Sequence, residues 1–87
     1  MDIIFHKDFD KSLEKFPPKT RKKVRKVLDT FHDNPHNPQL DNHALHGYLQ
    51  GFRSISEGGD LRLIFLQEDN YDRVKFYLVG SHSQLYE

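Results

Sequence analysis

The sequence predicts an α+β fold in which an N-terminal strand and a pair of helices pack on a small, mainly antiparallel sheet. Three observations predict it. Apolar residues recur at helical spacing between positions 7 and 33. Beyond position 46, three segments are rich in branched and aromatic side chains. Short runs of turn-forming residues separate these segments, so we expect them to pair as an antiparallel meander.

The first elements should be a short apolar strand at Asp2–Phe5 and a helix that begins at Lys7 or Asp8 and ends at Phe16. The apolar residues of this helix lie four and three positions apart, which places them on one buried face. They are Phe9, Leu13 and Phe16.

Pro17 and Pro18 should end the first helix and open a second, because proline lacks the amide that a helix interior needs but suits a first turn. The second helix buries apolar residues at i, i+3, i+4 and i+7. They are Val24, Val27, Leu28 and Phe31. Asn34 and Pro35 should end it, since a residue before proline is disfavoured in a helix. A loop then extends to about His46.

The three strands of the meander should be Gly47–Ile55, Leu61–Leu66 and Val74–Val79, with turns at 57–60 and 68–72. We expect the opening strand to join the same sheet after the helical pair has crossed one of its faces. No repeat or linker interrupts the pattern, so the sequence predicts one domain over residues 1–87.

The amino-acid composition excludes several classes of protein. The 87 residues include no cysteine, which excludes a disulfide framework and a thiolate metal site. No apolar run approaches the roughly 20 residues that a membrane span needs, and no basic lead precedes an apolar stretch at the start. We therefore expect a soluble cytoplasmic protein.

The charged residues are balanced overall, with 13 basic and 13 acidic side chains, but they are unevenly distributed. Six of the eight residues from Lys19 to Lys26 are basic and should point away from the core. Such a basic ridge can contact phosphates, or it can be the solvated face of a helix. Its candidate RNA or ribosome contacts are Lys19, Lys22, Lys23, Arg25 and Lys26.

Three segments, 41–47, 60–62 and 80–86, carry most of the side chains that are suited to chemistry. Together they supply imidazoles, a carboxylate, a guanidinium and a phenol. This set suits RNA cleavage by the substrate's own 2′-hydroxyl, which needs a base, an acid and a cation beside the phosphate. Arg62 is the suitable cation, because its planar fork can hold two phosphate oxygens.

The order of these segments resembles the RelE/ParE superfamily of toxins, particularly its YafQ-like branch, over nearly the whole chain. The motifs are Asn34-Pro35, LDNHALHG at 40–47, GFRSI at 51–55, GDLRLIF at 59–65 and GSHSQLY at 80–86. The resemblance implies a ribosome-dependent endoribonuclease that cuts messenger RNA without a metal or other cofactor. It also implies a cognate antitoxin that wraps and blocks the toxin, in a complex able to bind operator DNA.

Four residues match the YafQ-like pattern directly: His43, Asp60, His82 and Tyr86. Arg62 matches an arginine that related members of the superfamily keep in this strand, facing the scissile phosphate. The pattern has a further histidine where this sequence has Ser56, followed by Glu57. The base could therefore be His43 or Glu57.

Roles for the matched residues follow from their chemistry. His82 would give a proton to the leaving 5′ oxygen, His43 would act as the base or as an orienting group, and Arg62 would stabilise charge on the phosphorane. Tyr86 would stack on a base or steer the phosphate. Asp60 would orient His43 or His82 by accepting from one ring nitrogen.

Each site residue also has an interpretation without function. His82 could be an exposed residue near a terminus, and Arg62 an outward strand residue paired with Glu57 or Asp60. His43 and His46 could suggest zinc, but a zinc site needs three or four convergent ligands and the loop is not a regular helix. We therefore expect no metal site.

A second function is compatible with the same fold. A ParE-like toxin would bind and poison DNA gyrase without catalysis, and it would have no need of His43, Arg62, His82 and Tyr86 together. A third interpretation is a decayed toxin that retains only antitoxin binding or operator repression. The joint presence of these side chains favours the ribonuclease.

Overall fold

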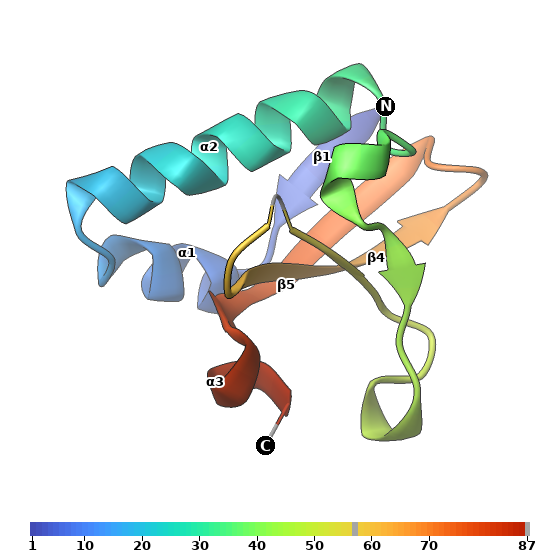
Figure 1. Ribbon diagram of the computed structural model, residues 1–87. Coiled ribbons are helices and arrows are strands. Elements are labelled where there is room, and N and C mark those ends of the chain that lie inside the picture. The colour runs from blue at the N-terminus through green and yellow to red at the C-terminus, as the bar shows by residue number, and fades with distance from the viewer. Residues whose placement is uncertain (57, 87) are drawn as a thin grey trace.

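The computed structural model describes residues 1–56 and 58–86, with the side chain of Tyr86 excepted. Five strands form one sheet in the order β1-β5-β4-β3-β2. Helix α2 crosses one face, and the short C-terminal helix α3 lies on the opposite side of the sheet (Figure 1). The predicted α+β class is thus confirmed. Within the described residues, no helix has the length and apolar character needed to cross a membrane.

The N-terminal half follows the sequence prediction closely. Strand β1 spans Asp2–Phe5 and pairs parallel with β5, so the opening strand does join the sheet. Helix α1 spans Lys7–Glu14 and begins where the His6 side chain accepts a hydrogen bond from the amide of Asp8 at 3.0 Å. It ends two residues earlier than predicted, because the amides of residues 15 and 16 bond three residues back.

Helix α2 spans Pro18–Asp33, with the predicted proline start and with Asn34 in extended conformation at its end. Its apolar face lies against the sheet, and the side chains of Val24, Val27 and Phe31 are buried. The chain then forms a short 3-10 helix, η1, at Pro38–Leu40. Leu40 is fully buried, so the loop after α2 is anchored in the core.

The antiparallel meander is confirmed in β3, β4 and β5. Strand β4, Leu61–Glu68, pairs with β3, Arg53–Ile55, and with β5, Arg73–Ser81. A β-bulge at Ile64/Phe65 shifts the register, so that Phe65 faces Phe76. Both phenylalanines therefore point toward the helical layer.

The predicted strand Gly47–Ile55 is wrong in its first half. Residues Gly47–Leu49 form a 3-10 helix, η2, and only Arg53–Ile55 form a strand. Gly47 and Gly51 adopt φ angles of +68° and +96°, which are incompatible with an extended strand. The turn lets Leu49 become buried, and the amide of Leu45 closes the loop on the oxygen of Phe52 at 2.9 Å.

Besides η1 and η2, two short elements were not predicted. Strand β2, His43–Ala44, adds to the sheet edge by pairing with β3, and helix α3 spans His82–Tyr86 at the C-terminal end. Both are too short to carry a periodic pattern of their own. Each depends on a neighbour: β2 on the edge of β3, and α3 on the end of β5.

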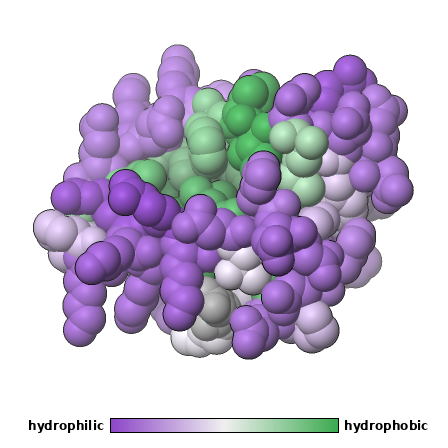
Figure 2. Space-filling model, turned by 90° about the horizontal axis from the view of Figure 1, so that it is seen from above, coloured by the Kyte–Doolittle hydropathy of each residue, from purple (hydrophilic) through white to green (hydrophobic). Residues whose placement is uncertain are grey.

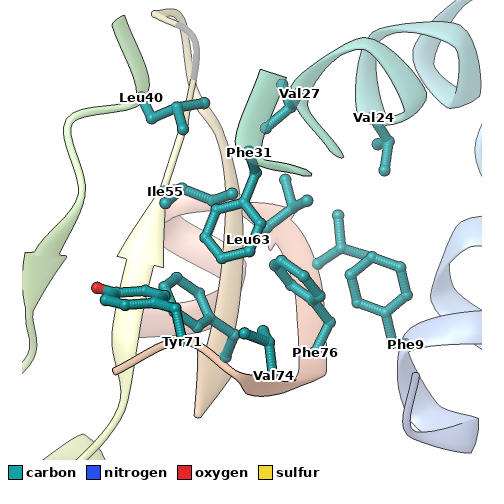
Figure 3. Close-up of a cluster of buried hydrophobic side chains, with 12 residues drawn as sticks. Phe9, Val24, Val27, Phe31, Leu40, Ile55, Leu63, Tyr71, Val74 and Phe76 are labelled. Atoms are coloured by element: carbon teal, nitrogen blue, oxygen red, sulfur yellow. The ribbon is translucent and has the colours of Figure 1, made fainter. Parts of the chain in front are cut away.

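The hydrophobic core lies between α1, α2 and the sheet. Figure 3 shows Phe31 of α2 among apolar side chains from the strands. Its ring lies 5.1 Å from Phe65, 5.3 Å from Phe76 and 6.1 Å from Tyr71, measured between centroids. Edge-to-face contacts of this kind add to the free energy gained by burial alone. Phe31 thus connects the helical layer to both central strands.

We predict that Phe31→Ala lowers the free energy of unfolding by about 3–5 kcal/mol, because it leaves a cavity at a fully buried position. Urea unfolding followed by circular dichroism measures the change. Phe5→Ala is the matched control, since Phe5 is 40% exposed and should cost clearly less. Equal losses for the two variants would contradict the central position of Phe31.

Candidate active site

A cleft of about 580 Å³ opens between the loop that follows α2, strand β4 and helix α3. Three of the residues singled out from the sequence line it: His43, Arg62 and His82. They come from segments about 20 residues apart in the chain. The sheet brings them together because β2, β4 and α3 all present residues at this end of the fold.

The His43 ring is held by its own chain. Nδ1 lies 2.7 Å from the main-chain oxygen of Asp41 and 3.8 Å from a carboxylate oxygen of the same residue. A carbonyl oxygen only accepts hydrogen bonds, so Nδ1 carries the proton. Nε2 is then the nitrogen that can accept a proton, as a general base requires.

Asp41 can make this contact because its backbone is left-handed, with φ +50° and ψ +46° at the end of η1. Aspartate tolerates this conformation better than most residues. The turn bends the main-chain oxygen of Asp41 back toward the side chain two residues later. The local geometry thus sets which nitrogen of His43 is protonated.

Arg62 is held from one side only. Its Nη1 atom donates to the main-chain oxygens of Gly59 at 2.8 Å and Leu61 at 3.1 Å. No ion pair joins it to Asp60 or to any other carboxylate in the part of the chain described. These two main-chain oxygens hold one edge of the guanidinium beside the cleft.

His82 begins α3, and Asp60 fixes its backbone. The amide of His82 donates to the main-chain oxygen of Asp60 at 3.0 Å and to its carboxylate at 3.2 Å. This contact attaches the start of α3 to the turn before β4. The orienting role predicted for Asp60 toward an imidazole ring stays a prediction, because the hydrogen bond of its carboxylate is accepted from the main-chain amide of His82.

Two further residues hold α3 beside the cleft. The hydroxyl of Tyr48, on η2, donates to the main-chain oxygen of Leu85 at 2.8 Å. At Gly80 a Cβ atom would lie 3.0 Å from the Gln84 side chain and 3.4 Å from that of Leu85. Glycine at this position lets the helix fold back closely on the end of β5.

Not every predicted site residue reaches the cleft. Asp60 is exposed and lines a second cleft, of about 540 Å³, between α2 and the turn before β4. The side chain of Tyr86 and the whole of Glu57 lie outside the described residues, so their predicted roles are untested. Of the predicted site residues, His43, Arg62 and His82 thus lie together in the cleft.

The basic ridge of α2 is exposed as predicted, at Lys19, Lys22, Lys23, Arg25 and Lys26. Seen from above, the face that carries α2 is largely hydrophilic, with an apolar strip between long polar side chains (Figure 2). Lys23 and Lys26 line the second cleft together with Asp60. The ridge thus borders the turn before β4, whereas the loop at 45–49 and the start of α3 line the first cleft, below α2 in Figure 1.

Three further polar residues of the cleft, Asp41, His46 and Tyr48, were given no catalytic role from the sequence, although the segment 41–47 includes the first two. Asp41 acts through its main-chain oxygen, which no side-chain motif reveals. His46 and Tyr48 follow His43 closely in the loop, so a curled loop would have suggested them. The mistaken strand at 47–55 concealed that curl.

Another hollow, of about 590 Å³, lies at the other end of β4 and β5. Its lining contains a single imidazole, His36, and neither lysine nor arginine. It therefore lacks the combination of groups that phosphate chemistry needs. The cleft at His43 is the better candidate because it combines three imidazoles with a guanidinium.

Comparison with known proteins identifies the family. Residues 1–87 match the family described as "Bacterial toxin of type II toxin-antitoxin system, YafQ". The chain belongs to this YafQ family. The predicted membership of the RelE/ParE superfamily, in its YafQ-like branch, is thereby confirmed. No curated protein matched the sequence.

Solved structures similar to this YafQ-family chain share its fold over nearly its whole length. YafQ from E. coli strain BL21(DE3) is 21% identical, with a TM-score of 0.79, and the match covers 99% of this chain and 98% of that one. YafQ in the E. coli DinJ-YafQ toxin-antitoxin complex is 21% identical, with a TM-score of 0.76 and coverage of 99% and 97%. A metal-bound toxin from Helicobacter pylori is 31% identical, with a TM-score of 0.68 and coverage of 99% for both chains.

In this YafQ-family chain, residues 1–56 and 58–86 contain no group of three histidine, aspartate or glutamate side chains placed to hold a metal ion. The two histidines of the loop, His43 and His46, lie at different turns of the chain. His43 is bonded to Asp41, and His46 precedes the left-handed Gly47.

We predict that Tyr48→Phe loosens α3 without unfolding the sheet. Removing the hydroxyl deletes its bond to Leu85, and a neutral hydrogen bond contributes roughly 0.5–1.5 kcal/mol at most sites. Because Tyr48 is 73% exposed, we expect the lower end of that range. Amide hydrogen exchange should quicken in α3 and stay unchanged in β4 and β5. Unchanged exchange in α3 would show that the tether is unimportant.

Proposed function

We propose that this toxin is an endoribonuclease that cleaves messenger RNA on the ribosome and thereby stops translation. One observation carries the proposal: His43, with its proton fixed on Nδ1, lines the same cleft as Arg62 and His82. These are the base, the cation and the acid that cleavage by a 2′-hydroxyl needs. The protein itself has to supply no nucleophile.

In the proposed reaction, Nε2 of His43 takes the proton of the 2′-hydroxyl while the 2′ oxygen attacks the adjacent phosphorus. The bond between phosphorus and the 5′ oxygen breaks, and His82 gives a proton to that oxygen. The products are a 2′,3′-cyclic phosphate and a 5′-hydroxyl. Imidazole suits both transfers because it titrates near neutral pH.

Arg62 would stabilise the negative charge that accumulates on the phosphoryl oxygens in the transition state. Main-chain oxygens of Gly59 and Leu61 fix one side of its guanidinium before substrate arrives. A preorganised cation needs little rearrangement during the reaction, which is the source of most electrostatic catalysis. The predicted roles of Asp60 and Tyr86 belong to this same proposal.

The basic ridge would contact ribosomal RNA and not the scissile phosphate. Its five candidate residues are exposed on α2, while the cleft opens beside α3 (Figure 1). Phosphate contacts supply affinity without sequence information, so this surface could position the toxin on the ribosome. We also propose a cognate antitoxin, as in the DinJ-YafQ complex, that blocks the toxin and with it binds operator DNA.

Primer extension on a defined messenger RNA tests the ribonuclease. Purified ribosomes translating that message should show new cuts with the wild-type chain. We expect His82→Ala and His43→Ala each to lower the cleavage rate by about 10²–10⁴-fold, because each removes a proton transfer. His32→Ala is the matched control, since His32 is exposed at the end of α2, and its rate should equal that of the wild type.

Three outcomes would contradict this proposal. Equal cleavage by His82→Ala and the wild type would remove His82 from the chemistry. If the wild type and His82→Ala both arrest growth in cells but no message is cut, the gyrase-poisoning function would be favoured. Gyrase supercoiling assays would then test it. Growth arrest by neither protein would indicate a decayed toxin.

We predict that changing Lys22, Lys23 and Arg25 to glutamate weakens ribosome binding and leaves the fold intact, because all three side chains are exposed. Sedimentation with ribosomes at several salt concentrations measures the effect. The slope of binding against salt should also fall for the variant. Unchanged sedimentation would show that the ridge is only the solvated face of α2.

A further inference from the structure

Asn42, the residue before His43, sits at the centre of a hydrogen-bonded cluster on the side of the loop away from the cleft. Its amide nitrogen donates to the main-chain oxygen of Pro35 at 2.9 Å and contacts the hydroxyl of Tyr71 at 3.1 Å. Its amide oxygen accepts from Nε of Arg53 at 2.8 Å. The side chain thus uses both of its N–H donors and its oxygen.

The cluster joins the loop after α2 to β3 and to the turn between β4 and β5. Pro35 follows α2, Arg53 lies in β3, and Tyr71 belongs to the turn between β4 and β5. Arg53 also reaches the main-chain oxygen of Asn42 at 3.5 Å, so it contacts both the side chain and the backbone of that residue. These contacts are partly buried, where a hydrogen bond is less exposed to competition from water.

Tyr71 is held in a costly conformation at the far end of the cluster. It is only 8% exposed and has a φ of +70°, as the third of three consecutive left-handed residues after Glu68. A bulky side chain with positive φ is a real outlier, and such strain persists only where the surroundings impose it. Its amide is bonded to the Gln67 side chain at 2.8 Å, and its ring packs on Phe31.

The short segment 40–43 therefore has fixed points on both sides of the turn at Asp41. Leu40 is fully buried, and its main-chain oxygen accepts from the amide of Ser56 at 2.7 Å. Asn42 is held by the cluster. Between them, Asp41 adopts the left-handed turn that aims its oxygen at His43. If Asn42 moved, that turn would lose one of its two supports.

We infer that Asn42, Arg53 and Tyr71 are positioning residues that fix the His43 ring with its proton on Nδ1. None of them lines the cleft, so each acts through the backbone at 41–43. The inference deepens the proposed function and rests on it for its catalytic meaning. The tautomer of His43 itself can be observed without any reaction.

The experiment compares Asn42→Ala and Tyr71→Phe with the wild-type chain. Tyr71→Phe keeps the ring in the core and removes only the hydroxyl that Asn42 contacts. Tyr77→Phe is the control: Tyr77 is half-buried on β5, and its hydroxyl makes no hydrogen bond among the described residues. ¹⁵N spectra of the histidine side chains report which ring nitrogen of His43 carries the proton.

We expect the wild type and Tyr77→Phe to show His43 with its proton on Nδ1, and the two cluster variants to show a mixture of tautomers. The cleavage rate at saturating ribosomes should fall by about 10–100-fold in Asn42→Ala, less in Tyr71→Phe, and stay unchanged in Tyr77→Phe. Ribosome affinity should stay unchanged in all three, because the basic ridge is intact.

A folded Tyr71→Phe chain with the wild-type His43 spectrum would overturn the inference, even if its stability or cleavage rate had fallen. If Asn42→Ala does not fold, Tyr71→Phe alone tests the inference. Failure of the proposed function is a separate result: a wild-type chain that cuts no RNA removes the ribonuclease, while the His43 spectra still decide whether the cluster sets the tautomer.

Discussion

Strands β4 and β5 pair along their whole length, from Leu61 opposite Ser81 to Glu68 opposite Arg73. Every other part of the sheet attaches to this pair: β3 to one edge, β1 to the other, and β2 to β3. The bulge at Ile64/Phe65 brings Phe65 and Phe76 onto one side, where Phe31 covers them. A shift of one residue in this pairing would expose that aromatic core.

The two ends of the same strand pair serve different purposes. At one end Arg62 and the segment after Gly80 form two walls of the cleft. At the other end, the turn that contains Tyr71 supports the loop of His43 through Asn42. The β4–β5 pair therefore holds Arg62, the start of α3 and the turn of Tyr71 in one rigid unit. Through Asn42, that turn supports the loop that carries His43. The more mobile elements of a site gain precision when they are held by a scaffold of this kind.

Charge is also divided between two faces. The basic residues of α2 lie on the helical side of the sheet, whereas the cleft lies beside α3 (Figure 1). Arg73 pairs with Glu68 at 3.2 Å and Asp69 at 2.7 Å, so part of the acidic charge is matched locally, in the turn far from the cleft. The neutral total thus conceals a strongly basic helix.

Elements whose pattern is local could be predicted from the sequence alone. The stripe of Val24, Val27 and Phe31 defined α2, the prolines defined where it starts, and the branched residues of β4 and β5 defined the meander. Resemblance to a family supplied His43, Arg62 and His82. These patterns work because each reports on a few neighbouring residues and on one buried face.

The other features depend on how distant segments pack together. Residues 47–52 have the composition of a strand, but left-handed glycines and the burial of Leu49 curl them into the wall of the cleft. The protonated nitrogen of His43 depends on the main-chain oxygen of Asp41, and the support of that turn depends on Tyr71, 29 positions beyond Asn42. Backbone oxygens and contacts between distant segments leave no periodic trace in a sequence, because they arise only when packing brings the segments together.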